Sequence, residues 1–233
     1  MSLKKIILIG ASGVAHEIID TLFDINKVSP EWEILGILDD APEKKDLNFY
    51  RDIKVLGTAE LIKDFDLSEV SFFVTFSSPA NFLNRKAYIE GLNSSHPGIK
   101  FANIIHPTAY LSETAKMGTG CFVGHNVHLD SLSKLGDHNI VLFNSIISRF
   151  VEIDDYSFVS ANVNITGNKK IGSSVYLGVK TTINANVGDC VLVSAGSFIN
   201  SDVEDMTLAS TKTEQNVLKF KTLKRFNALL SRH

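Results

Sequence analysis

Aliphatic residues recur at every sixth position through the middle of the chain. They are Leu111, Met117, Val123, Leu129, Leu135, Val141, Ile147, Ile153, Val159, Ile165, Ile171, Leu177 and Ile183. A period of six fits neither the 3.6-residue repeat of a helix nor the simple alternation of a strand. The residue after each aliphatic is never bulky and apolar, except at Leu142. The pattern predicts a hexapeptide-repeat parallel β-helix, in which each hexad supplies one short strand and three hexads make one coil.

The period breaks once near its end. The step from Ile183 to Val187 is four residues, after which Val193 and Ile199 resume the spacing of six. We expect the β-helix domain to occupy residues 104–205.

The chain before this repeat alternates between predicted strands and helices. A buried strand over residues 6–9 leads into Gly10-Ala11-Ser12-Gly13, a helix from residue 14 to about 23, and a strand over 33–38 that ends in Asp39-Asp40. This order is typical of a βαβ unit. The alternation continues with a helix near 58–65, a strand over 70–76, a helix over 79–92 and a strand near 100–103. Residues 1–103 are therefore predicted to form a Rossmann-like parallel α/β domain.

The last segment, residues 206–233, has a third pattern. A polar stretch over 208–215 precedes apolar residues at helical spacing between residues 216 and 230. We expect a C-terminal extension that ends in a helix.

Composition narrows the function. The formal net charge is -3 in 233 residues, and no run of 18 apolar residues occurs, so neither general nucleic-acid binding nor membrane insertion is expected. Cys121 and Cys190 are the only cysteines and belong to no Cys/His cluster, so no disulfide framework and no metal site is predicted. A reducing cytoplasm is the expected location.

The glycine turn is the first candidate for chemistry. Gly10 to Gly13 follows a strand and opens a helix, where backbone N–H groups can cradle a phosphate. The dinucleotide fingerprint G-x-G-x-x-G is incomplete, because Ser12 and Ala15 stand in place of its second and third glycines, so an NAD site is weakly supported. Asp39 either meets a ribose hydroxyl or caps a loop. Ser77 and Arg85 could complete a phosphate site, and Arg85 is otherwise an ordinary charge on a helix surface.

Three histidines fall within the repeat, at His125, His128 and His138. Each is a candidate general base. Polar residues outside the sixth position of a hexad point outward, however, and most such histidines are simply exposed on the surface.

The segments KIILIGASGVAHEIID (residues 5–20) and ILGILDD (residues 34–40), followed by the hexads, resemble the hexapeptide-repeat sugar acyltransferases. That family includes sialic acid O-acetyltransferases and UDP-4-amino-sugar N-acetyltransferases of bacterial glycan synthesis. The resemblance implies a left-handed β-helix, a homotrimer, an N-terminal domain that holds a nucleotide sugar, and acetyl-CoA as acyl donor in the cleft between neighbouring prisms.

The resemblance also implies site residues. The positions that look like nucleotide-sugar contacts are Gly10, Ala11, Ser12, Gly13, Asp39, Asp40, Ser77 and Arg85. Those that look like the lining of the acetyl-CoA arm are Ala161, Gly167 and Gly178.

The sequence departs from the family at the catalytic base. The family usually carries a histidine where Arg149 stands, and an arginine stays protonated and cannot act as a base. Arg149 could instead bind an anionic substrate or stabilise a developing oxyanion. His125 is a weaker candidate for the base, since it lies one coil and one hexad earlier. The G-x-P-A-K signature is also replaced, by the residues at 208–212.

The sequence thus predicts an acyl-CoA-dependent acyltransferase that modifies a hydroxyl or amine of a sugar. One alternative is a catalytically silent trimer that binds a sugar nucleotide or acts as a scaffold. The other is an NAD-linked enzyme whose β-helix only brings three chains together.

Overall fold

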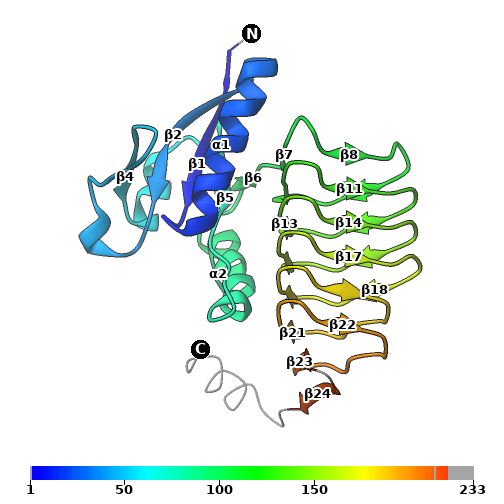
Figure 1. Cartoon of the computed structure of the whole chain (residues 1–233). Coiled ribbons are helices and arrows are strands. Elements are labelled where there is room, and N and C mark those ends of the chain that lie inside the picture. Colours follow the sequence, from blue (N-terminus) through cyan, green and yellow to red (C-terminus); the bar gives the residue numbers. More distant parts are fainter. Residues whose placement is uncertain (1, 213, 220–233) are drawn as a thin grey trace.

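The computed structural model describes residues 2–212 and 214–219. It has two parts that lie side by side, an α/β domain built from the N-terminal half and a tall prism of stacked coils (Figure 1). The Rossmann-like domain and the parallel β-helix predicted from the sequence are both confirmed. Among the described residues, no helix is long and apolar enough to cross a membrane.

A six-stranded sheet forms the centre of the α/β domain, in the order β3-β4-β2-β1-β5-β6. Its strands are β1 (Lys4–Ile9), β2 (Trp32–Leu38), β3 (Asn48–Tyr50), β4 (Ile53–Gly57), β5 (Val70–Val74) and β6 (Lys100–Phe101). Only the pairing of β3 with β4 is antiparallel. Residues 6–9 of β1 are buried, as expected for the central strand of a sheet covered on both faces.

Two α-helices and two short 3₁₀ helices connect these strands. They are α1 (Gly13–Val28), α2 (Phe82–Ser95), η1 (Pro42–Lys44) and η2 (Ala59–Asp64). Helix α1 buries the apolar face predicted from Ile18, Ile19 and Leu22. The helix expected near residues 58–65 is the 3₁₀ helix η2.

Three parallel sheets form the sides of the prism. Sheet I contains β7 (Ile104–Ile105), β10 (Phe122–Val123), β13 (Ile140–Val141), β16 (Phe158–Val159), β19 (Tyr176–Leu177), β21 (Leu192–Val193), β23 (Thr207–Lys212) and the antiparallel β24 (Glu214–Lys219). Sheet II contains β8 (Tyr110–Leu111), β11 (His128–Leu129), β14 (Ile146–Ile147), β17 (Asn164–Ile165), β20 (Thr182–Ile183) and β22 (Phe198–Ile199). Sheet III contains β9 (Lys116–Met117), β12 (Lys134–Leu135), β15 (Glu152–Ile153) and β18 (Lys170–Ile171).

The aliphatic of each hexad points into the prism, where most of them form one continuous core. Partners in adjacent coils are 18 residues apart up to the pair Ile165 and Ile183. The step of four then shortens the last coils, so that Ile183 pairs with Ile199 and Val187 bridges Ile171 and Val203. The break in the sequence period is therefore a shortened corner that leaves the inward column unbroken.

Sheet I carries the α/β domain. Its outward residues Ile104, Phe122, Ile140 and Phe158 are buried in the same apolar cluster as the inner face of α1. This shared core extends to Phe73 in β5, whose ring meets that of Phe122 edge to face, with 6.5 Å between centroids. The two domains therefore share one apolar interface.

The C-terminal expectation is partly wrong. Residues 216–219 belong to β24, which pairs with β23 in an antiparallel hairpin instead of starting a helix. The remainder of the expected helix, residues 220–230, lies outside the described residues.

Candidate functional site

A cavity of about 350 Å³ opens where β1 and β2 end. It is lined by Ile9, Gly10, Ala11, Ser12, Leu38, Asp39, Asp40, Ala41, Lys44, Phe76, Asn81 and Tyr88. Ligands bind in this part of open α/β sheets, because the loops after the strands diverge there and the first turn of a helix offers its N–H groups.

Gly10 gives the turn after β1 its shape. Its φ is +103°, a conformation that side chains rarely adopt, and an added Cβ would lie 3.0 Å from Thr75 Oγ1. The hydroxyl of Thr75 donates to the carbonyl oxygens of Ile9 and Gly10. The glycine is therefore required so that the turn can pack against the end of β5.

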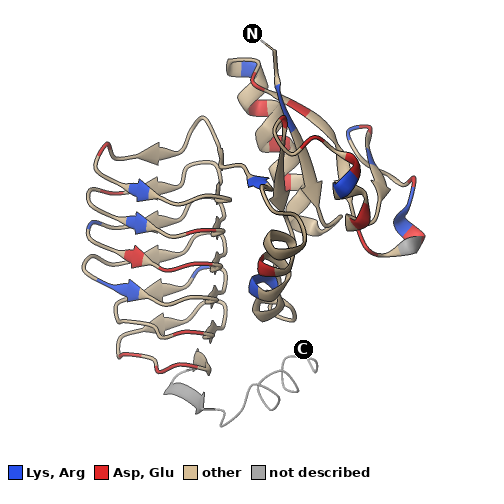
Figure 2. Ribbon diagram, turned by 180° about the vertical axis from the view of Figure 1, so that it is seen from behind, with Lys and Arg blue, Asp and Glu red and all other residues tan. Residues whose placement is uncertain are grey.

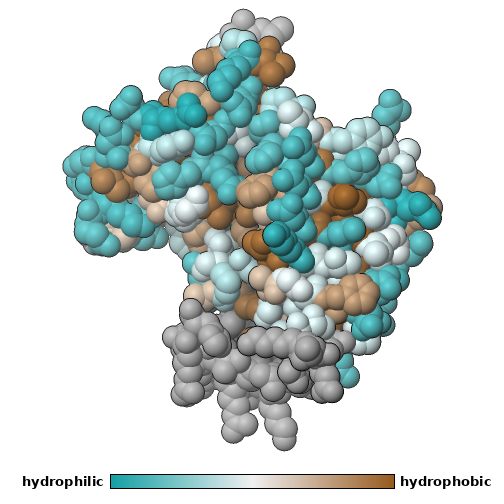
Figure 3. Space-filling view, viewed as in Figure 1, coloured by the Kyte–Doolittle hydropathy of each residue, from teal (hydrophilic) through white to brown (hydrophobic). Residues whose placement is uncertain are grey.

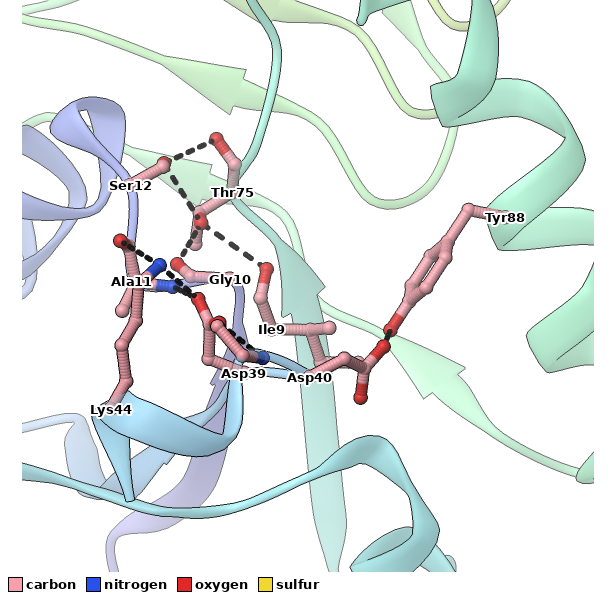
Figure 4. Close-up of polar contacts among 10 residues, drawn as sticks. Ile9, Gly10, Ala11, Ser12, Asp39, Asp40, Lys44, Thr75 and Tyr88 are labelled. Atoms are coloured by element: carbon pink, nitrogen blue, oxygen red, sulfur yellow. Dashed lines mark hydrogen bonds and ion pairs between the residues drawn. The ribbon is translucent and has the colours of Figure 1, made fainter. Parts of the chain in front are cut away.

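The carboxylate of Asp39 organises the floor of the cavity (Figure 4). It accepts hydrogen bonds from Ala11 N–H at 2.7 Å, Ala41 N–H at 3.0 Å and Lys44 Nζ at 2.9 Å. Burial alone would raise the pKa of Asp39, but these three donors outweigh burial and lower it. Asp39 thus caps the glycine loop, and it stays ionised at neutral pH.

Aromatic residues form the opposite wall of the cavity. The ring of Tyr88 meets that of Phe76 edge to face, with centroids 5.0 Å apart. The hydroxyl of Tyr88 donates to Asp40 Oδ2 at 3.3 Å, and Asp40 Oδ1 also accepts Ala59 N–H at 2.9 Å. Burial, together with the negative charge of Asp40, raises the pKa of Tyr88. The wall therefore offers apolar ring faces and a neutral phenol to a ligand.

The cavity brings together five of the eight residues predicted to bind a nucleotide sugar, namely Gly10, Ala11, Ser12, Asp39 and Asp40. The other three do not line it. Gly13 opens α1 beside the cavity, and the Cβ of a larger residue there would meet nothing within 4 Å. Ser77 is buried, with no hydrogen-bond partner for its hydroxyl among the described residues. Arg85 is 1% exposed, so it is neither a helix-surface charge nor a wall of the cavity.

Sequence reasoning missed Lys44, Phe76 and Tyr88 in this site. Lys44 stands in a charged stretch that reads as a solvated loop, and its ion pair with Asp39 depends on the fold of that loop. Tyr88 lies six residues into α2, where an aromatic residue ordinarily indicates core packing.

Arg149 lies on the corner between sheets II and III. Its side chain is exposed, and its carbonyl oxygen accepts Asn168 N–H from the next coil at 3.1 Å. Gly167 stacks against Arg149, because an added Cβ at Gly167 would lie 3.1 Å from the Arg149 carbonyl oxygen and 3.6 Å from its Cγ. The N–H of Gly167 makes no hydrogen bond to any residue that the structure describes. A guanidinium and a backbone N–H are thus available on one corner.

His125 lies on a different corner, between sheets I and II. It stacks on Phe143, with centroids 4.8 Å apart, and lies 5.6 Å from the ring of His106, which is paired with Asp24 of α1 at 3.3 Å. Burial, followed by the charge of His106, lowers the pKa of His125. Asp24 is eleven residues along α1 from Gly13, or about 16 Å. His125 is therefore placed toward the far end of α1 from the glycine loop.

The predicted acetyl-CoA residues divide between these two corners. Ala161 and Gly178 lie in later coils, on the same corner as His125. Backbone hydrogen bonds from Asn144 N–H to the His125 carbonyl oxygen and from Lys180 N–H to the Ala161 carbonyl oxygen join the coils at this corner. Gly178 is buried, and an added Cβ would lie 2.5 Å from Ala195 N. Gly178 is therefore needed for the contact between coils, whereas Gly167 faces the surface beside Arg149.

The two remaining histidines of the predicted set, His128 and His138, do not line the cavity. His128 lies on sheet II against Tyr110, with ring centroids 4.5 Å apart. His138 is buried between Phe101 and Tyr156. Among the described residues, no group of three or more His, Cys, Asp or Glu side chains is placed to hold a metal ion.

Comparison with known proteins agrees with this architecture. Residues 5–88 match the PglD N-terminal domain family. The structure is similar to a mutant of perosamine N-acetyltransferase from Caulobacter crescentus in complex with CoA and GDP-perosamine, with a TM-score of 0.79 and 21% identity over 94% of this chain and 99% of that one. It is also similar to the acetyltransferase domain of PglB from Neisseria gonorrhoeae, with a TM-score of 0.81 and 23% identity over 92% and 100% of the two chains.

A curated relative is an uncharacterized protein of Acanthamoeba polyphaga mimivirus. It is 31% identical over 134 residues, which are 58% of this chain. The chain spans 24% of the length of that relative. The resemblance drawn from the glycine loop and the hexads is thus confirmed: residues 5–88 match the PglD N-terminal domain family, and the chain has the fold of these solved acetyltransferases, with a left-handed β-helix.

Proposed function

We propose that the protein transfers an acetyl group from acetyl-CoA to an amine or hydroxyl of a nucleotide-linked sugar. The observation that carries the proposal is the cavity at the end of β1 and β2, which lies in a domain packed directly on a hexapeptide-repeat prism. The two similar structures are named as an N-acetyltransferase with CoA and GDP-perosamine bound and as an acetyltransferase domain. We further propose that this activity serves the synthesis of bacterial surface polysaccharide in the cytoplasm.

The cavity suits the nucleotide end of such a substrate. The ring faces of Phe76 and Tyr88 can pack against a base, while the first turn of α1 and Lys44 can receive the diphosphate. The side chain of Lys44 is 34% exposed, so it can turn toward a ligand. Asp39 then still accepts hydrogen bonds from the backbone N–H groups of Ala11 and Ala41.

The transfer step does not require a general base at the position of Arg149. The acceptor nitrogen or oxygen attacks the thioester carbonyl carbon, the new C–N or C–O bond forms, and the C–S bond breaks. CoA leaves as a thiolate, and the proton lost by the acceptor passes through solvent to that thiolate. Arg149 and the N–H of Gly167, which bonds to no described residue, can stabilise the negative charge that develops on the carbonyl oxygen.

Assembly into a homotrimer is part of the proposal. The α/β domain covers sheet I, and sheet III presents charged residues on successive strands, which Figure 2 shows on one prism face. The outward residues of sheet II are uncharged, apart from one histidine. Three of them are large and exposed, namely Tyr110 at 55%, Ile146 at 45% and Phe198 at 49%. Apolar residues also reach the prism surface in Figure 3. Sheet II is therefore the face best suited to a second copy.

Phe150 supports the same conclusion. It follows Arg149 and is 45% exposed, and its φ of +61° is the corner conformation that also occurs at Leu132 and Tyr156. An exposed aromatic side chain at this corner suits contact with a neighbouring prism, so Arg149 would lie where two chains meet.

The alternative is a catalytically silent trimer that binds a sugar nucleotide. It is favoured by Arg149 at the position of the family base and by the distance along α1 between His125 and the glycine loop.

Release of free CoA thiol distinguishes the two functions. The purified protein is incubated with acetyl-CoA and with GDP-perosamine or UDP-4-amino sugars, and thiol is followed with a chromogenic disulfide. Thiol release that requires both substrates supports the transferase. Nucleotide-sugar binding with no thiol release from any acceptor supports the silent binder.

A further inference from the structure

Helix α2 contacts the cavity and the prism at the same time. On the cavity side it supplies Tyr88, and Asn81 stands at its N-terminal cap. On the prism side Phe82 lies 5.8 Å from the ring of Tyr176, and Lys86 Nζ lies 5.9 Å from the ring of Tyr156. The position of α2 therefore determines where the cavity lies relative to the coils.

Arg85 is the most buried polar residue of this helix, with 1% of its surface exposed. One terminal nitrogen of its guanidinium donates to the carbonyl oxygen of His138 in the prism. The other donates to the carbonyl oxygen of Val74, the last residue of β5, at 3.0 Å. One side chain thus bonds the backbone of both domains.

This arrangement is costly. Burial lowers the pKa of Arg85 to about 10, so the guanidinium remains charged at neutral pH. No carboxylate of the described residues forms an ion pair with it, and its Nε has no hydrogen-bond partner there. A buried cation without an acid partner is destabilising unless its donors are well used. A residue with that cost is better explained by the geometry that it fixes than by the stability that it adds.

The bond to Val74 reaches the cavity through one further residue. Thr75 follows Val74 directly, and its hydroxyl holds the carbonyl oxygens of Ile9 and Gly10 and lies 3.3 Å from Ser12 Oγ. Arg85 therefore fixes the end of β5, the glycine loop beside it and the turn of the prism at His138.

We propose that Arg85 is a positioning residue that locks the cavity of the α/β domain at a fixed distance and orientation from the β-helix. The inference rests on the proposed function, because its purpose is to hold a sugar bound in one domain against an acyl donor bound on the other. Displacement of reacting groups by about 1 Å can cost about 100-fold in rate.

The test compares Arg85→Met and Arg85→Lys with the parent and with Lys63→Met, which removes a cation from the exposed surface of η2. Steady-state thiol release is measured for the folded fraction of each protein. We call the two hydrogen bonds from Arg85 to His138 and Val74 the clamp. Loss of the clamp should lower kcat by about 10- to 100-fold in Arg85→Met, while the KM values for acetyl-CoA and nucleotide sugar change by less than about threefold. Arg85→Lys keeps the charge but cannot fork to both carbonyls, so its kcat should lie between the other two.

A second readout does not depend on activity. Spin labels at Glu60→Cys in the α/β domain and Glu113→Cys in the prism, in a Cys190→Ser background diluted with unlabelled protein, report the distance between the domains. Cys121 is buried and its pKa is raised to about 12, chiefly by burial, so it should resist labelling. The distance distribution should be narrow in the parent and in Lys63→Met and broad in Arg85→Met.

The outcomes separate the two proposals. Absence of thiol release in the parent contradicts the proposed function. In that case the spin-label distances still test the clamp, because they do not depend on activity. A kcat of Arg85→Met equal to that of the parent, or a distance distribution as narrow, overturns the clamp. If Arg85→Met does not fold, Arg85→Lys must show the lower kcat and the broader distribution, and parental values in that variant overturn the clamp.

Discussion

Lys44 and Asp39 form an ion pair at the floor of the cavity, with 2.9 Å between Nζ and Oδ2. The Asp39 side chain is 11% exposed and that of Lys44 is 34% exposed, so the carboxylate belongs to the loop while the ammonium reaches the opening. The pair gives the cavity one fixed anion and one cation that a diphosphate can approach.

Replacing Lys44 by Met should weaken the binding of a nucleoside diphosphate. A hydrogen bond to a charged group contributes about 1.5 to 3 kcal/mol, so the Kd for UDP or GDP should rise by about tenfold or more. Calorimetric titration measures this change, with Lys63→Met as the control outside the cavity. Equal Kd values for the two variants would exclude Lys44 from the phosphate site.

Replacing Arg149 should affect the chemical step. In Arg149→Ala, kcat should fall by about 10² to 10³, the usual effect of removing one oxyanion donor, with little change in the KM of the nucleotide sugar. Arg149→His would restore the residue that the resembled family usually carries, and the pH–rate profile should then gain a limb near pH 6.5. An Arg149→Ala protein as fast as the parent would remove Arg149 from the mechanism.

Gly178→Ala should destabilise the prism. The added Cβ would lie 2.5 Å from Ala195 N and 2.8 Å from Ala195 Cα, and these backbone atoms cannot move without displacing the next coil. The expected loss is about 1 to 3 kcal/mol of unfolding free energy. Gly91→Ala in α2 meets nothing within 4 Å and should instead stabilise by up to about 1 kcal/mol. Denaturant unfolding of both variants tests the contrast, and equal shifts would contradict it.

His138 should make the protein sensitive to acid. Burial, followed by the nearby charge of Arg85, lowers the pKa of His138 from 6.5 to about 4. The unfolded chain therefore binds a proton between these pH values that the folded chain does not, so stability is present above pH 6.5 and is lost as the pH falls toward 4. The loss from this group should be roughly 3 kcal/mol.

His138→Asn provides the test of this pH dependence. Asparagine tolerates the φ of +57° at this position and does not titrate. The free energy of unfolding, measured from pH 7 to pH 4, should fall less steeply in the variant. A slope equal to that of the parent would show that protonation of His138 is not responsible.

The prism could be predicted because its signal is local and repeated. Each inward aliphatic is followed six residues later by the next, so the coil geometry is present in every short window of sequence. Even the shortened corner could be located from the step between Ile183 and Val187. The glycine loop and Asp39 were recognisable for the same reason, since a strand, a tight turn and a helix follow one another directly.

Arg85 shows why the rest could not be predicted. Its partner His138 lies 53 residues away, and the apolar residues of α2 show almost no helical periodicity, so the sequence does not distinguish a charge on the surface from one buried between two domains. The strand over residues 214–219 could not be predicted for the same reason. Its pairing with β23 overrides the helical spacing of its apolar residues. Contacts between distant segments therefore determined what sequence periodicity could not.

Calorimetric titration of the purified protein with acetyl-CoA tests the central claim most directly. The account predicts saturable binding at about one site per chain, because a prism of this fold is proposed to hold the acyl donor. It also predicts that binding persists in Lys44→Met, which alters only the cavity of the α/β domain. Absence of saturable binding to the folded protein would contradict an acetyl-CoA-dependent transferase and leave a protein that binds sugar nucleotides alone.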